Sequence, residues 1–176
     1  MNPTDAHAKQ DAESFMVAAV AEHESALRRY ATRLVGDPHR AHDIVQDTFI
    51  KLIGQPPAER PDDLAPWLFT VCRHRALDVL RKEGRMSRFA EGEVERLPAT
   101  EPRPGRALEA AETQHALLGL IDRLPPNQQE VIRLKFQNGF SYKQISGITE
   151  LSVSNVGFLI HTAVQRLRRE FAAQQP

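Results

Sequence analysis

One expected helix places an aromatic residue and basic residues in line. Trp67, His74 and Arg81 are spaced seven residues apart, so a helix would carry them on one face, with Arg73 and Asp78 beside them. An exposed tryptophan above a basic ladder suits unpaired nucleic acid, because aromatic rings stack on bases while arginine follows the phosphates. The alternative is a half-buried tryptophan that covers the end of a small core.

A second candidate surface belongs to residues 124–169, whose pattern predicts a helix, a short helix, a tight turn and a recognition helix. Pro125 and Pro126 would start the first of these helices, and Gly139 would end it in a left-handed conformation. Ser141 and Gln144 form a predicted capping box, and Ser152 or Ser154 would cap the last helix. The side chains that turn away from the apolar stripe of this last helix, or lie on its flanks, are Phe158, His161, Thr162, Gln165, Arg166, Arg168 and Arg169. The pattern predicts a helix-turn-helix that binds DNA; a plain helical bundle with a solvated basic end is the alternative.

A third surface is acidic and partly apolar. Asp37-Pro38 predicts a cap and a first helical residue for a helix that runs to about Ile53. With Phe49 in its core stripe, the face left over holds Asp43, Gln46, Asp47 and Ile50. Carboxylates, an amide and an outward isoleucine suit a protein partner, while a solvated acidic face is the ordinary alternative.

The elements that position these residues are all predicted helices. A long helix runs from Ser14 to Gly36, a proline-rich loop occupies residues 55–66, and a further helix continues to about Glu83 with Leu68, Val71, Cys72, Ala76 and Val79 facing the core. Residues 84–106 are rich in proline and glycine, which predicts a flexible linker. We therefore expect an all-α protein with two small helical domains, 14–88 and 108–172, joined by a linker at 89–107.

Composition limits the functions that the chain could have. Its formal net charge is zero and its pI about 7.1, which is unexpected for a protein that holds DNA unaided. Cys72 is the single cysteine and predicts an inert core thiol. We see no leader and no apolar run of the length that crosses a membrane, so we expect a soluble, cytoplasmic protein.

The residues give little support for an enzyme. The sequence has no phosphate-cradling glycine loop, no nucleophile elbow and no cysteine pair for zinc. His39, His42 and Asp43 resemble metal ligands, but three such residues early in one helix are a weak signal. We expect no enzyme, no cofactor and no metal.

Three motifs occur in order along the chain. The first runs from Asp43 to Phe49, the second comprises Trp67-Leu68 and residues 73–81, and the third is Leu124-Pro125-Pro126 before a helix-turn-helix. Together they resemble the motifs of a bacterial RNA polymerase sigma factor of the extracytoplasmic-function group in the sigma-70 family. The similarity spans about residues 21–169. It implies that the neutral chain relies on core RNA polymerase to hold promoter DNA, and that its partners are core polymerase and promoter DNA. The family often has an anti-sigma factor as well, and the linker would allow one to wrap both domains.

The resemblance also implies residue roles. The core-polymerase-binding motif matches Asp43, Gln46, Asp47 and Phe49, and Ile50 lies on the same face. The helix that reads and opens the minus-ten element, together with the loop before it, matches Trp67, Arg73, His74, Asp78 and Arg81. The helix that reads the minus-thirty-five element would use Ser154, Asn155, Phe158, His161, Thr162, Gln165 and Arg166.

The chain departs from the family pattern in three places. His74 stands where asparagine is frequent, and Glu150 stands in a turn that usually has glycine, so we expect that turn to be shaped differently. The basic residues expected early in the reading helix are replaced by Gly157-Phe158-Leu159, and a later arginine is Thr162. Because arginine to guanine is the commonest specific contact, we expect an atypical upstream element in which Phe158 and Thr162 contact thymine methyls and His161 or Gln165 adds polar contacts.

Two other functions remain open from the sequence. One is an autonomous helix-turn-helix regulator, against which the neutral charge and the tryptophan face argue. The other is a sigma-like adaptor that binds a partner protein through residues 43–50 without opening DNA.

Overall fold

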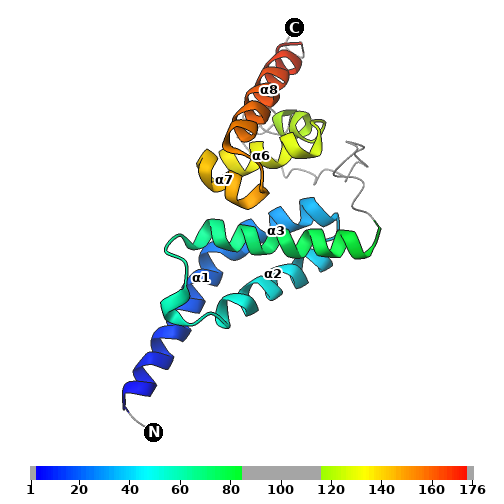
Figure 1. The fold of residues 1–176 in the computed structure, drawn as a ribbon. Helices are drawn as coiled ribbons and strands as arrows, with labels where there is room; N and C mark the ends of the chain where they lie inside the picture. Colours follow the sequence, from blue (N-terminus) through cyan, green and yellow to red (C-terminus); the bar gives the residue numbers. More distant parts are fainter. Residues whose placement is uncertain (1–2, 85–115, 174–176) are drawn as a thin grey trace, which may run out of the picture. The chain divides into compact units, whose positions relative to one another are not determined.

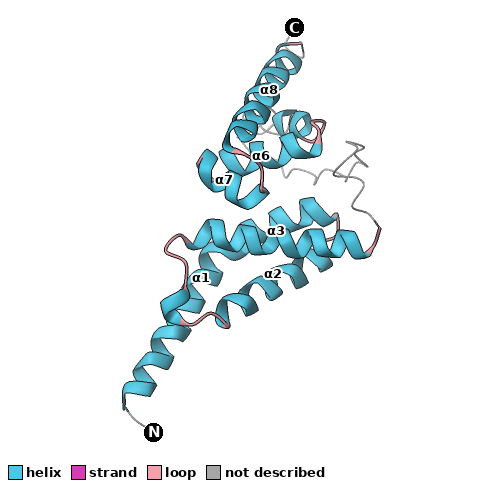
Figure 2. Cartoon of the chain, in the orientation of Figure 1, coloured by secondary structure: helices cyan, strands magenta, loops and turns pink. Residues whose placement is uncertain are grey.

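The computed structural model describes residues 3–84 and 116–173, with side chains from residue 10 onward. Every regular element in these residues is helical (Figure 2), which confirms the all-α prediction. The elements are α1 (Pro3–Val35), α2 (Pro38–Ile53), the short 3-10 helix η1 (Pro57–Glu59), α3 (Leu64–Lys82), α6 (Pro126–Phe136), α7 (Tyr142–Thr149) and α8 (Val153–Ala172). They form two compact units, an N-terminal unit with α1, α2 and α3 and a C-terminal unit with α6, α8 and most of α7. The predicted linker at 89–107 lies outside the described residues, and the domain boundaries stay predictions.

The first helix is longer than the sequence predicted. It begins at Pro3, so the expected start at Ser14 was wrong. Residues 3–13 are polar but contain three alanines, and a high helix propensity continues a helix even where no apolar stripe marks it. Gly36 ends the helix as expected: its φ is 76°, a left-handed conformation that glycine adopts without strain.

The second helix begins where its caps predicted. The Asp37 carboxylate accepts hydrogen bonds from the backbone N–H groups of His39 (2.8 Å) and Arg40 (3.3 Å), and Pro38 occupies the first turn. These N–H groups, Arg40 first and His39 second, hold the pKa of Asp37 below its usual value of 3.8. The Arg40 and His39 charges contribute less to this shift. The carboxylate at this end also faces the positive end of the helix dipole.

The N-terminal unit is built around one core to which all three helices contribute. Helix α1 packs against α2 and α3, and these two pack against each other (Figure 1). The Tyr30 and Phe69 rings meet at 5.0 Å between centroids, tilted by 45°. The predicted core residues of α3 are buried except Val79, which is half-buried, while its neighbour Leu80 is buried. The prediction for Val79 was therefore wrong by one position, because the helix turns Leu80 toward its partners.

In the C-terminal unit, residues 116–121 are helical and precede α6. Pro125 and Pro126 open α6 as predicted, and Val131 and Leu134 on this helix are fully buried. Phe136, which shares the apolar spacing of this helix, is instead 64% exposed. Gly139 takes a φ of 75° after the helix end, as predicted.

Local hydrogen bonds set the boundaries of α7 and α8. Both bonds of the Ser141–Gln144 capping box are present, at 2.7 and 3.2 Å. Ser152, the first of the two predicted candidates, caps α8 by accepting the Asn155 N–H at 3.2 Å. The turn between the helices has the left-handed residue that the family's glycine would supply, because Glu150 itself adopts φ 62° and ψ 15°. The expectation of a different turn shape was wrong.

Candidate polymerase and nucleic-acid interfaces

The outward face of α2 carries the side chains that the sequence placed there. Asp43, Gln46, Asp47 and Ile50 are exposed, and Phe49 lies beneath them with 8% exposure. An isoleucine that is 63% exposed beside two carboxylates costs hydration free energy in the isolated chain. The face is therefore suited to a partner that offers both apolar and basic groups.

The structure adds one residue that the sequence analysis missed. Ile53 is 62% exposed and follows Ile50 by three residues, so it extends the same stripe toward the end of α2. Helical periodicity already contained this signal. It was overlooked because the expected stripe stopped at Ile50, one turn before the helix ends.

The candidate minus-ten face of α3 is less open than the sequence suggested. His74 and Arg81 are exposed, but Trp67 is half-buried, as are Arg73 and Asp78. Trp67 is therefore the half-buried tryptophan that the sequence left open as an alternative, and the exposed tryptophan was wrong. Such a ring has few conformations to lose on binding, which favours stacking.

An ion pair holds Arg81 on this face. Its Nη1 atom lies 2.6 Å from Asp78 Oδ1, with both side chains at least half exposed. Exposed pairs of this kind contribute at most about 1 kcal/mol to stability. The contact therefore restrains the arginine without preventing a phosphate from replacing the carboxylate.

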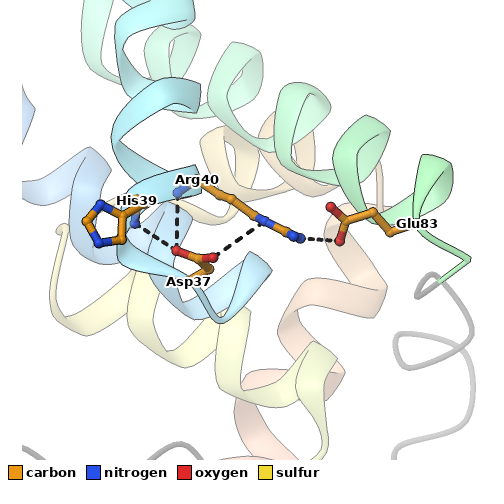
Figure 3. Close-up of polar contacts among 4 residues, drawn as sticks. All are labelled: Asp37, His39, Arg40 and Glu83. Atoms are coloured by element: carbon orange, nitrogen blue, oxygen red, sulfur yellow. Dashed lines mark hydrogen bonds and ion pairs between the residues drawn. The ribbon is translucent and has the colours of Figure 1, made fainter.

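A second set of polar contacts fixes the end of α3. Figure 3 shows Arg40, in the first turn of α2, placed between Asp37 and Glu83: its guanidinium bonds to Glu83 after α3, and its Nε lies 3.4 Å from Asp37 Oδ2. The start of α2 and the end of α3 are far apart in sequence but are joined by this side chain. The face that ends with Arg81 is thereby fastened at its C-terminal end.

The outer face of α8 is aromatic and polar. Ser154 and Asn155 are exposed in the first turn, and Phe158 is 64% exposed one turn later. His161 and Gln165 are also exposed and contact each other, with 2.9 Å between Nε2 of each. Arg166 is held close to the helix, because its Nε donates to Glu170 on the same helix at 2.7 Å.

Thr162 and Gly157 show how this helix differs from a basic one. The Thr162 hydroxyl donates to the Phe158 carbonyl at 2.9 Å and accepts from Gln128 Nε2 at 3.5 Å, so its polar atom is already engaged. At Gly157, a Cβ atom would lie 3.5 Å from Cε2 of Tyr142. The Tyr142 ring thus lies against the helix where a basic side chain would begin.

The described part of the chain holds neither an accessible thiol nor a cluster of metal ligands. Cys72 is fully buried, and burial raises the pKa of its thiol to about 12 despite a hydrogen bond with Thr48. No cluster of three or more His, Cys, Asp or Glu residues in ranges 3–84 and 116–173 is arranged to hold a metal ion. The helices of the same ranges are all too short or too polar to cross a membrane.

Comparison with known proteins assigns the family. The model of sigma-70 region 2 matches residues 19–86, and the model of sigma-70 region 4 matches residues 114–167. The extracytoplasmic-function sigma factor SigL of Mycobacterium tuberculosis is 31% identical over 160 residues, which cover 88% of each chain. The chain belongs to the extracytoplasmic-function group of sigma-70 family RNA polymerase sigma factors. Region 2 contains α2 and α3, and region 4 contains the helix-turn-helix.

Two further similarities agree with this assignment. SigE of Mycolicibacterium smegmatis is 30% identical over 150 residues, which cover 85% of this sigma factor and 58% of that relative. A solved structure of the sigma factor RpoE from Bartonella quintana, in complex with the anti-sigma factor NepR, matches with a TM-score of 0.67 and 26% identity. The match covers 90% of this sigma factor and 97% of that chain.

Family membership decides one of the open questions. The protein is a promoter-directing sigma factor, a DNA-binding component of transcription initiation, and not an autonomous helix-turn-helix regulator.

Proposed function

We propose that this sigma factor binds core RNA polymerase through the outward face of α2, opens the minus-ten element with α3 and the loop before it, and reads the minus-thirty-five element with α8. The observation that carries this proposal is that both family regions occur in order, each with its candidate side chains on an outward helix face. Cys72, the one cysteine, is buried, and none of these side chains is a nucleophile held by a base. We therefore propose a subunit without enzymatic activity that acts in the cytoplasm, where polymerase is found.

Polymerase binding is proposed to use Asp43, Gln46, Asp47 and Ile50, with Ile53 added and Phe49 supporting them from the core. The apolar pair Ile50 and Ile53 would supply buried area, and the carboxylates would select a basic surface. Ile50→Ser combined with Asp47→Asn should weaken binding to core polymerase at least tenfold in a fluorescence titration. Arg29→Ala, on the exposed part of α1, is the matched control, and equal affinities for the two variants would refute this assignment.

Promoter opening is proposed to depend on Trp67, Arg73, His74, Asp78 and Arg81. Trp67 would stack on an unpaired base, and Arg81 would exchange its Asp78 contact for a phosphate. Asp78 would then keep the Arg81 side chain in position until the phosphate replaces it. Asp78→Ala should leave core binding unchanged and increase the salt sensitivity of open-complex formation, whereas Arg81→Ala should reduce opening and its dependence on salt.

Upstream recognition is proposed to be atypical. Ser154 and Asn155 would contact the backbone, Phe158 and the Thr162 methyl would contact thymine methyl groups, and His161, Gln165 and Arg166 would add polar contacts. The 64% exposure of Phe158 and the engaged hydroxyl of Thr162 support this division of roles. Selection of promoters from a randomised library tests it: Phe158→Ala should relax the preference at thymine positions. Recovery of the usual family element, unaffected by Phe158→Ala, would refute the hypothesis.

We also propose that an anti-sigma factor regulates this protein. The support is the solved complex of RpoE with NepR, which matches 90% of this chain. The tagged sigma factor is purified by affinity from its own host, under conditions in which its target genes are not transcribed. This purification should recover a partner protein that core polymerase displaces. Recovery of polymerase alone under all growth conditions would argue against such a partner.

Run-off transcription from a library of genomic fragments tests the proposal as a whole. Core polymerase is used alone, with this protein, and with the Trp67→Ala, Arg81→Ala double variant. New transcripts that the double variant fails to produce would support promoter opening by α3. Binding to core polymerase without any new transcript would replace the proposal with the adaptor function.

A further inference from the structure

The loop between α2 and α3, residues 54–63, is held by a contact from a part of α1 that the family match does not include. The Cζ atom of Arg60 lies 4.3 Å from the centroid of the Phe15 ring. Phe15 precedes residues 19–86, which match sigma-70 region 2. This distance is well within the range of cation–π contacts, and the planar guanidinium suits stacking on a ring.

The burial pattern of the loop marks Arg60 as an anchor. Residues 56–59, including the short helix η1, are exposed, and so are Asp62 and Asp63, whereas Arg60 and Pro61 between them are half-buried. The Nε atom of Arg60 is buried and has no hydrogen-bond partner among the described residues. This guanidinium nitrogen loses its hydrating water and gains no hydrogen bond in return. The contact with the aromatic face offsets that loss of hydration.

The backbone of the loop provides little restraint of its own. Its hydrogen bonds are local ones, such as Glu59 N–H to Pro56 O at 2.9 Å and Arg60 N–H to Pro57 O at 3.5 Å. These bonds shape η1 but do not tie it to another helix. Figure 1 shows the chain after α2 passing next to α1 before α3 begins. The contact between Arg60 and Phe15 joins these two parts of the chain.

We propose that Phe15 and Arg60 are positioning residues: the extended α1 clamps the α2–α3 loop in the conformation that accepts the opened minus-ten strand. The loop leads into α3 only four residues before Trp67, so its position sets the approach to that ring. Neither residue needs to contact DNA in this role. The inference rests on the proposed function of α3 and of the loop before it.

Limited proteolysis tests the clamp without polymerase. A glutamate-specific protease cuts the Glu59–Arg60 bond only when η1 opens locally. Phe15→Ala should speed this cut by about two- to fivefold, the factor expected for one partly exposed cation–π contact. Arg60→Lys should have a smaller effect, and Phe15→Tyr should keep the wild-type rate. Val17→Ala, 66% exposed on the same helix, is the control and should change nothing.

A double-mutant cycle separates the clamp from a general loss of structure. Arg60→Ala in a Phe15→Ala background should add little to the opening of η1, because the shared contact is already gone. Additive effects, or an unchanged cleavage rate in Phe15→Ala, would overturn the proposal. The free energy of unfolding of the N-terminal unit should fall by no more than the two- to fivefold factor corresponds to, about 0.4 to 1 kcal/mol, since its core lies between α1, α2 and α3 beyond this contact.

Transcription by reconstituted holoenzyme tests the role in promoter opening. Initiation rates are measured on a promoter and on copies of it with single substitutions in the minus-ten element. Phe15→Ala should reduce the ratio of the rate on the original promoter to the rate on each copy at least threefold, with core binding unchanged. Phe15→Tyr should restore this ratio. An unchanged ratio would overturn this inference while the proposed function survives. Absence of promoter-specific transcription by the wild-type protein would overturn the proposed function and the promoter role of the clamp, and proteolysis would still decide whether the clamp exists.

Discussion

Replacing Glu150 with glycine is expected to stabilise the C-terminal unit by about 0.5 to 1 kcal/mol. Glu150 adopts φ 62° in the turn between α7 and α8. A side chain in this left-handed region costs about 1 to 2 kcal/mol, and glycine avoids that cost. Glycine also gains freedom in the unfolded chain, which offsets about 0.5 to 1 kcal/mol of the benefit. The remainder is the expected gain.

Native-state hydrogen exchange is the appropriate assay, because it reports each unit separately. The slowest amides of α7 and α8 should show an opening free energy that is higher by the same amount in Glu150→Gly. The slowest amides of α2 and α3 serve as an internal control and should not change. Glu150→Ala removes the carboxylate but keeps the strained φ, so it should give no gain. An equal gain in Glu150→Ala and Glu150→Gly would refute the reasoning, since the benefit would then come from losing the side chain and not from relieving the backbone.

Three further predictions concern caps and a buried thiol. Ser141→Ala removes one side of the capping box of α7 and should cost about 1 kcal/mol, measured by the same exchange experiment; no change in α7 would contradict the cap's role. The backbone N–H groups of Arg40 and His39 lower the pKa of Asp37 in the folded protein. As the pH falls below 3.8, Asp37 of the unfolded chain therefore binds its proton first. The free energy of unfolding should decrease with acidification until the folded carboxylate is also protonated. Asp37→Asn keeps a capping acceptor and should lose this pH-dependent part in denaturation curves, whereas an unchanged acid dependence would assign it to other carboxylates. Cys72, with its pKa raised to about 12 by burial, should resist a thiol-specific disulfide reagent at neutral pH until the N-terminal unit unfolds, and rapid labelling of the native protein would show that the thiol is accessible.

The features that the sequence predicted correctly depend on short stretches of chain. The caps at Asp37 and Ser141, and the helix ends at Gly36 and Gly139, involve residues at most a few positions apart. Helical periodicity likewise predicted the exposed face of α2, because spacing alone decides which residues share a face. The order of the motifs then indicated the family, which the matches to regions 2 and 4 confirm.

Tertiary structure decided what depends on contacts between distant residues. Trp67 is half-buried, and Leu80 replaces Val79 in the core, because the packing of three helices fixes how far each turns inward. The ring of Tyr142 lies against Gly157, and Arg60 stacks on Phe15, across separations for which no sequence period exists. Even the turn at Glu150 was predicted wrongly, because two capped helices, of which α8 packs on α6, hold their connection in a conformation that the residue itself disfavours. Local helix propensity thus determined which segments are helical, and packing between helices determined which side chains they expose.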